Sequence, residues 1–399
     1  MESDRQKPKN HNVFYIGLLS FFGGIAQDIF VPILPIYLTL ILGFNKTFVG
    51  TTEGLVSASA AIFAVAGGYF SDKWKKQKPL IFFGYLLSMI SRSLLAVITS
   101  GAGVVGLRLG DGIGKGVKDP PKDVLVSEDS AKTRGRSFGI VRMLDTFGSV
   151  IGPLILFLLL YFFKDSPYVY HYVLIFSAVP LFVTLYITAS KLKEASYLQP
   201  ELAPRQPDKL SGKLPKSFFL FLAISLVFTL GNSSDAFLIL RAQGVGFSIT
   251  LIPIVIALFN LVYAGVSVPF GILSDKIGRV PTLLIGWAVY ALAYFGFAYA
   301  VNPATVWILY ALYGVYFGAT WGVAKAFLAD IVDQGFRGRA FGIYGTTIGV
   351  ATFFASYLAG FLWDRFGAQI PFYFGAGMAA LAAILLVSFS NKLKPAVNN

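Results

Sequence analysis

Long apolar runs alternate with short polar connectors along almost the whole chain. A helix needs about 20 residues to cross the hydrocarbon core of a bilayer, and each apolar run is long enough to do so. The predicted spans are 13–43, 48–71, 79–100, 102–126, 136–163, 168–190, 216–242, 248–273, 280–300, 303–330, 338–363 and 368–390. The pattern therefore predicts an all-α integral membrane protein with twelve transmembrane helices.

A polar stretch divides these spans into two groups of six. Residues 191–215 are rich in Lys, Pro and polar side chains, which is typical of a linker. We expect an N-terminal six-helix bundle in residues 1–190, a cytoplasmic linker in 191–215, and a second six-helix bundle with a short cytoplasmic tail in 216–399.

Composition supports a lipid environment. The 399 residues are 56% hydrophobic and 13% charged, whereas a soluble chain carries about 25% charged residues. The net charge of +13 would suit nucleic acid, but the basic residues cluster in the connectors, so we expect no nucleic-acid partner. The chain has no cysteine and two distant histidines, His11 and His171, so no metal site and no cofactor are predicted. The polar start runs straight into an apolar span, so no cleavable signal peptide is expected.

The distribution of Lys and Arg sets the expected orientation, because basic residues are retained on the cytoplasmic side. Of the 33 Lys and Arg, only Lys46, Lys164 and Arg365 fall on the odd-to-even connectors. We therefore expect a multi-pass protein of the cytoplasmic (inner) membrane, a monomer in contact with the lipid bilayer, with both termini cytoplasmic.

The two halves are related in sequence. Gly68–Lys73 (GYFSDK) recurs as Gly271–Lys276 (GILSDK), and Arg134 (RGRSFGI) recurs at Arg337 (RGRAFGI), both at an offset of 203 residues. Six helices separate the copies, so both have the same membrane orientation. That is a parallel repeat, and it predicts a binding site at the interface between the halves.

The repeated connector resembles the signature Gly-x-x-x-Asp-Lys/Arg-x-Gly-Arg of the major facilitator superfamily. The second copy fits closely; the first departs at Lys75 and Lys76. The resemblance implies a cytoplasmic latch that closes in one state and parts in the other; a plain positive-inside anchor is the alternative. The residues predicted for this latch and the cytoplasmic gate are Gly68, Asp72, Lys73, Gly271, Asp275, Lys276, Arg279, Lys122 and Lys325.

The fourth span resembles a second signature of that superfamily, Arg-x-x-Gln-Gly-x-Gly, with Asp111 in place of the glutamine after Arg108. Its run from Gly114 to Asp123 (GKGVKDPPKD) is similar to a bacterial and archaeal permease branch that includes magnetosome-associated facilitators. The resemblance implies a role for Arg108 in proton coupling. Independently, Asp111, Lys115, Lys118 and Lys122 follow at helical spacing and form one polar stripe. Charges in a bilayer are costly, so the stripe predicts a watery cavity, with an inert packing network as the alternative.

Further polar residues lie within other spans. Because a buried carboxyl group favours its neutral form, we expect Asp28 and Asp235 to carry protons. Arg108 and Asp111 are predicted to take part in this proton coupling, with Arg108 attracting or releasing the neighbouring acid. The residues predicted to line the substrate cavity are Arg92, Arg108, Lys115, Arg142, Asp145, Asn232, Asn260 and Arg241. Arg142 and Asp145 are equally compatible with a structural pair, and Glu53 is expected to be structural or part of a gate.

These features predict a secondary active transporter that works by rocker-switch alternating access, since no ATP-binding loop of the form G-x-x-x-x-G-K-[ST] is present. Protons are the expected coupling ion, and an excess of basic residues within the spans favours a small anionic or zwitterionic cargo, such as a carboxylate or a metal chelate. The run Gly148-x-x-x-Gly152-Pro153 resembles an antiporter motif, which keeps a proton/drug antiporter open as an alternative. A non-transporting sensor or assembly factor is a further alternative. An enzyme is not expected, because the sequence shows no pairing of a nucleophile with a base.

Overall fold

A computed structural model describes residues 11–127, 134–194, 214–333 and 336–393, and all regular structure in these ranges is helical. The first six segments are α1 (His11–Phe30) continued by α2 (Leu34–Ile36) and a π-helical turn (Tyr37–Ile41), α3 (Lys46–Trp74), α4 (Lys78–Leu94), α5 (Gly101–Ser127), α6 (Arg134–Phe162), and α7 (Val169–Phe176) continued by α8 (Ala178–Ser190). The predicted linker lies largely outside the described residues.

The second six segments repeat this order. They are α9 (Lys216–Gly231) continued by α10 (Ala236–Gly244), α11 (Ile252–Ile277) after a 3₁₀ turn (Ile249–Leu251), α12 (Arg279–Tyr299), α13 (Pro303–Asp330), α14 (Arg337–Phe366) and α15 (Ile370–Ser388), before a final 3₁₀ turn (Ser390–Lys392). The predicted all-helical, two-repeat architecture is confirmed.

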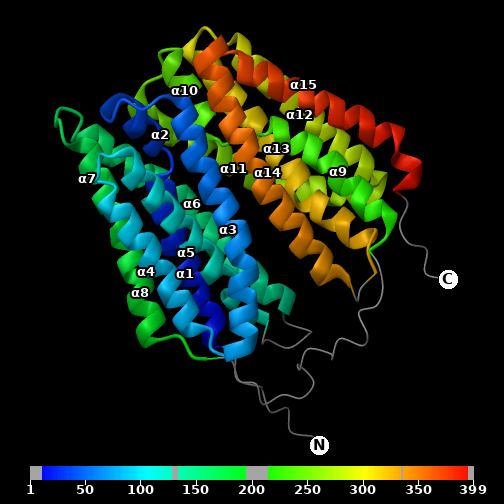
Figure 1. Cartoon of the computed structure of the whole chain (residues 1–399), viewed down its shortest axis with the longest axis horizontal. Helices are drawn as coiled ribbons and strands as arrows, with labels where there is room; N and C mark the ends of the chain where they lie inside the picture. Colours follow the sequence, from blue (N-terminus) through cyan, green and yellow to red (C-terminus); the bar gives the residue numbers. More distant parts are fainter. Residues whose placement is uncertain (1–10, 128–133, 195–213, 334–335, 394–399) are drawn as a thin grey trace, which may run out of the picture.

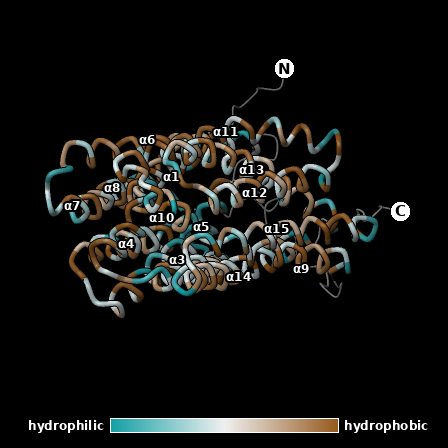
Figure 2. Tube along the Cα trace, turned by 90° about the horizontal axis from the view of Figure 1, so that it is seen from above, coloured by the Kyte–Doolittle hydropathy of each residue, from teal (hydrophilic) through white to brown (hydrophobic). Residues whose placement is uncertain are grey.

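Ten helical segments of the described chain are long and apolar enough to cross a membrane. The other two are α4, which ends at Leu94 although the predicted span ran to residue 100, and α5, which carries the charged stripe. Figure 2 shows the largely hydrophilic trace of α5 among hydrophobic neighbours. The two helices pack against each other and α5 also packs on α3, so lipid need not solvate the charges.

The first, sixth and seventh segments are interrupted rather than continuous, the sixth between α7 and α8. The first bends between Phe30 and Leu34, where Pro32 supplies no backbone N–H for the helix. The seventh breaks between Gly231 and Ala236, where Asn232 leaves the helical region of backbone space. The prediction of one helix over 216–242 is therefore wrong at its centre, where Asp235 directly precedes the second helix.

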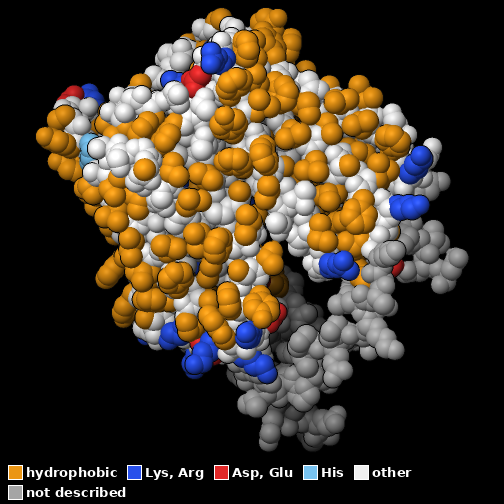
Figure 3. All heavy atoms as spheres, viewed as in Figure 1, with side chains coloured by type: hydrophobic (Ala, Val, Ile, Leu, Met, Phe, Trp, Pro, Cys, Tyr) orange, Lys and Arg blue, Asp and Glu red, His pale blue; other side chains and the backbone are white. Residues whose placement is uncertain are grey.

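The halves lie side by side and meet through two helix pairs, α3 with α14 and α6 with α11 (Figure 1). These pairs are related by the repeat, because α3 corresponds to α11 and α6 to α14. Figure 3 shows hydrophobic side chains over most of the visible surface, with Lys and Arg gathered mainly along its lower and right-hand edges. We call the end of the molecule where α3 meets α4 the basic end, and the end where α3 begins the opposite end.

The halves are sealed together at the opposite end. A side chain on Gly50 of α3 would overlap the Ser356 carbonyl of α14, and one on Gly360 of α14 would overlap the Lys46 carbonyl. Asp364 of α14 accepts hydrogen bonds from the backbone N–H groups of Lys46 (3.1 Å) and Thr47 (2.7 Å) and from the Thr47 hydroxyl (2.6 Å). A residue of the second half thus caps the first turn of a helix in the first half. Figure 3 shows a hollow between the halves at the lower edge, away from this seal.

Candidate functional site

A cavity of about 790 Å³ lies between the halves. Its walls come from α1, α4, α5, α6 and α8 of the first half, and from the second half only Trp321 and Lys325 of α13 line it. Six cationic side chains line it, namely Arg92, Lys115, Lys118, Lys122, Arg142 and Lys325, together with the four acids Asp28, Asp119, Asp123 and Asp145. The cavity is therefore strongly polar, with a basic excess.

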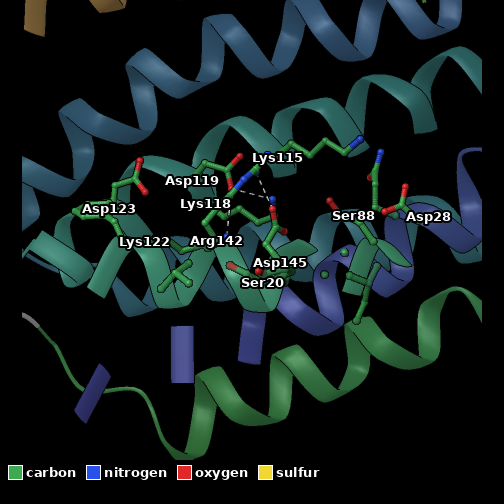
Figure 4. A pocket seen from close by; sticks show the side chains of 18 of the residues that line it. Ser20, Asp28, Ser88, Lys115, Lys118, Asp119, Lys122, Asp123, Arg142 and Asp145 are labelled. Carbon is green, nitrogen blue, oxygen red and sulfur yellow. Dashed lines mark hydrogen bonds and ion pairs between the residues drawn. The ribbon is translucent and has the colours of Figure 1, made fainter. Parts of the chain in front are cut away.

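Helix α5 supplies half of these charged side chains because its stripe turns inward. Its glycines make this possible: Gly112 and Gly116 pack against the α3 backbone, and Gly114 packs against Gly84 of α4. Close backbone approach on those sides leaves the stripe facing the cavity. Figure 4 shows its lysines and aspartates along one wall, with Asp123 and Asp28 at opposite ends of the view.

The inner end of the stripe forms a buried ion network. Asp111, which is fully buried, binds Arg92 (3.2 Å), Arg108 (3.3 Å) and Lys115 (3.5 Å). Arg108 reaches on to Glu53 of α3 at 2.6 Å. Arg92 also donates a hydrogen bond to the side-chain amide oxygen (Oε1) of Gln27 at 2.7 Å.

This network changes the expected role of Arg108. Its side chain is 1% exposed and does not line the cavity, because Glu53 and Asp111 hold it between α3 and α5. The prediction that Arg108 lines the cavity is wrong for this conformation. Its partner Glu53 was not foreseen as such, since a contact between residues 55 positions apart leaves no signal in local spacing.

Asp28 lines the cavity from α1. Its carboxylate forms a hydrogen bond with the Ser149 side chain of α6 and is attracted electrostatically by Arg92 and Lys115 at longer range. Among the described residues no cation lies within ion-pair distance of it. Of the four acids that line the cavity, Asp28 and Asp123 have no ion-pair partner among the described residues, whereas Asp119 and Asp145 do.

The part of the cavity nearer the basic end carries two clusters of cations on aromatic rings. In the first half, Lys118 and Lys122 lie near Asp119 (3.1 and 3.7 Å) and over the ring of Tyr85. On the other side, Lys325 and Arg142 lie over the ring of Trp321. Lys122 and Lys325, which were predicted for the cytoplasmic gate, both line the cavity; their role as gate residues stays a prediction.

Arg142 connects the halves. It pairs with Asp145 one turn further along α6 at 2.9 Å and donates to the Tyr263 hydroxyl of α11 at 2.7 Å. Asn260 of α11 donates to the Ser149 carbonyl of α6 at 2.8 Å. The predicted cavity residues Arg142 and Asp145 do line the cavity, whereas Asn260 lies in the contact between α6 and α11 and does not.

The second half holds Asp235 among tyrosines rather than cations. Tyr313 donates to its carboxylate at 2.6 Å, Asn232 donates to Tyr316 at 3.0 Å, and Tyr290 donates to the Gly231 carbonyl at 2.8 Å. Asp235 and Asn232 do not line the cavity in this conformation. The aromatic cage around the break in the seventh segment was not predicted, because its rings come from two other helices, α12 and α13.

Arg241 has a structural position. Its guanidinium group donates to the carbonyls of Phe297, Ala298 and Ala300, at 2.8, 3.0 and 2.8 Å. These carbonyls belong to the C-terminal end of α12 and the residue after it, so the prediction that Arg241 lines the cavity is wrong here.

The two copies of the signature connector differ. In the second copy Arg279 binds Asp275 of its own motif, Ser274 (2.6 Å) and Asp330 at the end of α13 (3.0 Å). In the first copy Asp72 is exposed. Close helix approach occurs at Gly67, against Val117, while a side chain on Gly68 would make only ordinary contact and Gly271 faces open space. Neither Gly68 nor Gly271, both predicted for the latch, therefore brings two helix ends into close contact in this conformation.

The twelve membrane segments, the two repeats and the polar cavity between them define a membrane transporter. The sequence model of the Major Facilitator Superfamily matches residues 16–240 and 220–398, and the chain belongs to this superfamily. An uncharacterized MFS-type transporter of Methanocaldococcus jannaschii is 34% identical over 392 residues, which cover 97% of this chain and 96% of that protein. The class H tetracycline resistance protein of Pasteurella multocida is 23% identical over 319 residues, covering 74% and 76%.

Solved structures agree on the fold. The nucleoside transporter NupG aligns with a TM-score of 0.77 at 14% identity, covering 95% of this chain and 99% of that one. A D-xylose-proton symporter aligns with a TM-score of 0.75 at 18% identity, covering 96% and 98%. At such low identity these likenesses establish the architecture and leave the cargo to be argued from the cavity.

Proposed function

We propose that the protein is a proton-coupled secondary transporter of a small anionic or zwitterionic solute, such as a carboxylate or a metal chelate. The observation that carries the proposal is the cavity lining, with six cationic side chains against four acids. An anion entering there meets several positive charges in a region partly removed from water, where each attraction is stronger than in bulk solvent.

The lining argues against a lipophilic drug as the cargo. Ligand pockets for apolar molecules are walled mainly by hydrophobic and aromatic side chains, whereas ten charged side chains line this cavity. The antiporter-like glycines have a packing role: Gly148 and Gly152 of α6 lie against the backbone of α1 at Phe21 and Ile25.

Alternating access would follow from the contrast between the two ends, because the halves are sealed together at the opposite end and a cavity lies between them nearer the basic end. We assign the basic end to the cytoplasmic side by the positive-inside rule. Both termini would then be cytoplasmic, and the protein would lie in the inner membrane. In this orientation the cavity serves the cytoplasmic side and the α3–α14 contact closes the outer side. Rocking residues 1–190 against 216–399 as a monomer would part Asp364 from α3 and bring the basic ends of α3 and α14 together. Asp72 would then reach the first turn of α14, whose positive dipole end favours a carboxylate.

Asp28 is the proposed proton carrier. It lines the cavity between the charged wall of α5 and the backbone of α6, without a fixed cationic partner. Asp235 has a comparable position in the second half but is held by Tyr313, and it would join the cycle when the outer seal opens. Arg108 and Asp111 would transmit the charge of the cavity to the α3–α5 contact.

Purified protein in liposomes that enclose a pH-sensitive dye tests the proposal. We expect the addition of an accepted carboxylate to change the pH of the lumen, and an imposed pH gradient to drive its uptake. The Asp28→Asn variant should exchange labelled for unlabelled cargo but lose gradient-driven uptake. Asp165→Asn, in the connector between α6 and α7, is the matched control and should behave as the wild type. Uptake that is indifferent to the pH gradient in the wild type would contradict proton coupling.

A further inference from the structure

Of the three aromatic rings that line the cavity, Trp321 is the most exposed, followed by Phe138 at 38%. Trp321 of α13 is 44% exposed although it lines the cavity between the halves. Tyr85, on the other side, is 1% exposed and is held by its hydrogen bond to the Leu19 carbonyl. An indole left open inside a cavity costs hydrophobic stabilisation that burial would provide, and it offers a flat surface to a ligand.

Two cations from different halves lie over this ring. The Lys325 ammonium nitrogen is 3.5 Å from the ring centroid, and the Arg142 guanidinium carbon is 5.1 Å from it. Lys325 follows Trp321 by four residues, so both project from the same face of α13. We call Trp321, Lys325 and Arg142 the tryptophan shelf.

Lys325 makes no ion pair with a described residue, although Asp123 acts on it at longer range. Within the described chain no carboxylate lies within ion-pair distance of its ammonium group, in contrast to Lys118 and Lys122, which both lie near Asp119. A cation that rests on a ring without an acidic partner can turn to an incoming anion and release the ring face. Arg142 keeps its own acid, Asp145, but about half of its surface is exposed, so it can add a second contact.

The shelf also spans the boundary between the halves. Arg142 belongs to α6, and it reaches both Trp321 of α13 and the Tyr263 hydroxyl of α11. A ligand bound on the shelf therefore touches both halves at once. This is the arrangement needed for a cargo to influence their relative movement, because a ligand shifts only an equilibrium whose states it contacts differently.

We infer that the tryptophan shelf is a binding subsite for the flat, conjugated part of the cargo, and that the cargo is an organic anion that carries an aromatic or similarly planar group. The inference rests on the proposed function, since it refines the class of anion that the cavity takes. The carboxylate contacts Lys325 and Arg142, and the planar group stacks on Trp321. A cavity of about 790 Å³ lies within the range of roughly 300–1,000 Å³ that suits small organic ligands.

Benzoate and cyclohexanecarboxylate form a matched pair of probes, because they share a carboxylate and a six-membered ring and differ in the π face. Calorimetric titration of the purified protein should show benzoate binding about five-fold more tightly, as expected from one aromatic stacking contact. Trp321→Leu should abolish this preference, while Trp321→Phe should keep part of it. Lys325→Gln should weaken both ligands equally.

Trp307→Phe is the control for the loss of an indole elsewhere, because Trp307 packs against Phe247 away from the cavity. It should keep the full preference, and a thermal unfolding curve for each variant establishes that it is folded. Equal binding of the two acids by the wild type, or a preference that survives Trp321→Leu, would overturn the shelf and leave the anion proposal standing. Binding of neither acid up to their solubility would count against both.

Discussion

The two inner helices that face each other across the molecule, α5 and α13, have the same framework and opposite chemistry. Gly112 and Gly116 of α5 pack on α3, as Gly314 and Gly318 of α13 pack on the repeat-related α11. Counting one residue back from each glycine pairs Asp111 with Tyr313 and Lys115 with Phe317. In mid-helix the repeat thus runs at 202 residues, one fewer than at the flanking motifs.

The difference shows how one fold divides its tasks. The first half places a buried ion network and a lysine wall on this framework, whereas the second half places aromatic rings there, such as Tyr313 of α13, which stacks on Phe259 of α11 with 5.5 Å between centroids. Charges need partners or water and so create a cavity, while rings fill space. This explains why the cavity belongs almost entirely to the first half.

The largest effect is expected where the ion network loses its centre. Asp111→Asn leaves Arg92, Arg108 and Lys115 without their shared acid, and breaking a buried ionic group costs about 3–5 kcal/mol. Asp119→Asn, whose side chain is 57% exposed, removes an acid from the same stripe and should cost under about 1 kcal/mol. Thermal unfolding in detergent compares the two; equal losses would mean that the network is inert.

In the second half we expect a smaller effect from a single hydroxyl. Tyr313→Phe removes the hydrogen bond to Asp235 and should destabilise the protein by about 1–3 kcal/mol. Tyr310→Phe is the matched change, because the Tyr310 hydroxyl is buried and has no hydrogen-bond partner among the described residues. It should be neutral or slightly stabilising. The reverse order of the two melting temperatures would contradict the aromatic cage described here.

The seal at the opposite end allows a comparison between a cap from the other half and a cap from the same half. Asp364→Ala removes the acceptor that holds the first turn of α3, and it should shift the equilibrium towards the form open at that end by about 1 kcal/mol. Asn45→Ala removes the cap that Asn45 itself gives to the Phe48 N–H group (2.8 Å) and should leave that equilibrium unchanged. Distances between spin labels on α3 and α14 report the populations. A shift of equal size in both variants would show that the cross-half contact has no special role.

The smallest effect concerns the two signature connectors. Lys75 ends α3 with φ of +51°, and the corresponding residue after α11 is Gly278 with φ of +96°. A left-handed conformation costs a residue with a side chain about 1 kcal/mol, so Lys75→Gly should stabilise the protein by up to about 1 kcal/mol and Gly278→Ala should destabilise it. A lower melting temperature for Lys75→Gly would show that this strain is offset elsewhere.

Sequence patterns predicted the fold well because they act locally. The apolar runs located the membrane segments, the repeated motifs gave the two-repeat architecture, and helical spacing predicted the α5 stripe from Asp111 to Lys122. Of the residues predicted for the substrate cavity, Arg92, Lys115, Arg142 and Asp145 line it in this structure, while their role in binding stays a prediction.

Local sequence patterns could not predict which groups pair with the charged side chains. Glu53 meets Arg108 only because α3 packs on α5, and Arg241 is occupied by the end of α12 rather than by a ligand. The break before Ala236 depends on the aromatic cage around Asp235, which assembles from distant helices. Each of these outcomes is decided by tertiary packing, which can override local propensity.

The central claim is that the cavity of the first half takes an organic anion from the basic, cytoplasmic end. The sequence has no cysteine, so a single Phe138→Cys change in the cavity wall, where the side chain is 38% exposed, provides a unique label site. A membrane-impermeant thiol reagent should modify it rapidly from the cytoplasmic side in inverted vesicles. Organic carboxylates should slow the reaction, and quaternary amines of similar size should not. Protection by the amines with none by the carboxylates would contradict the account.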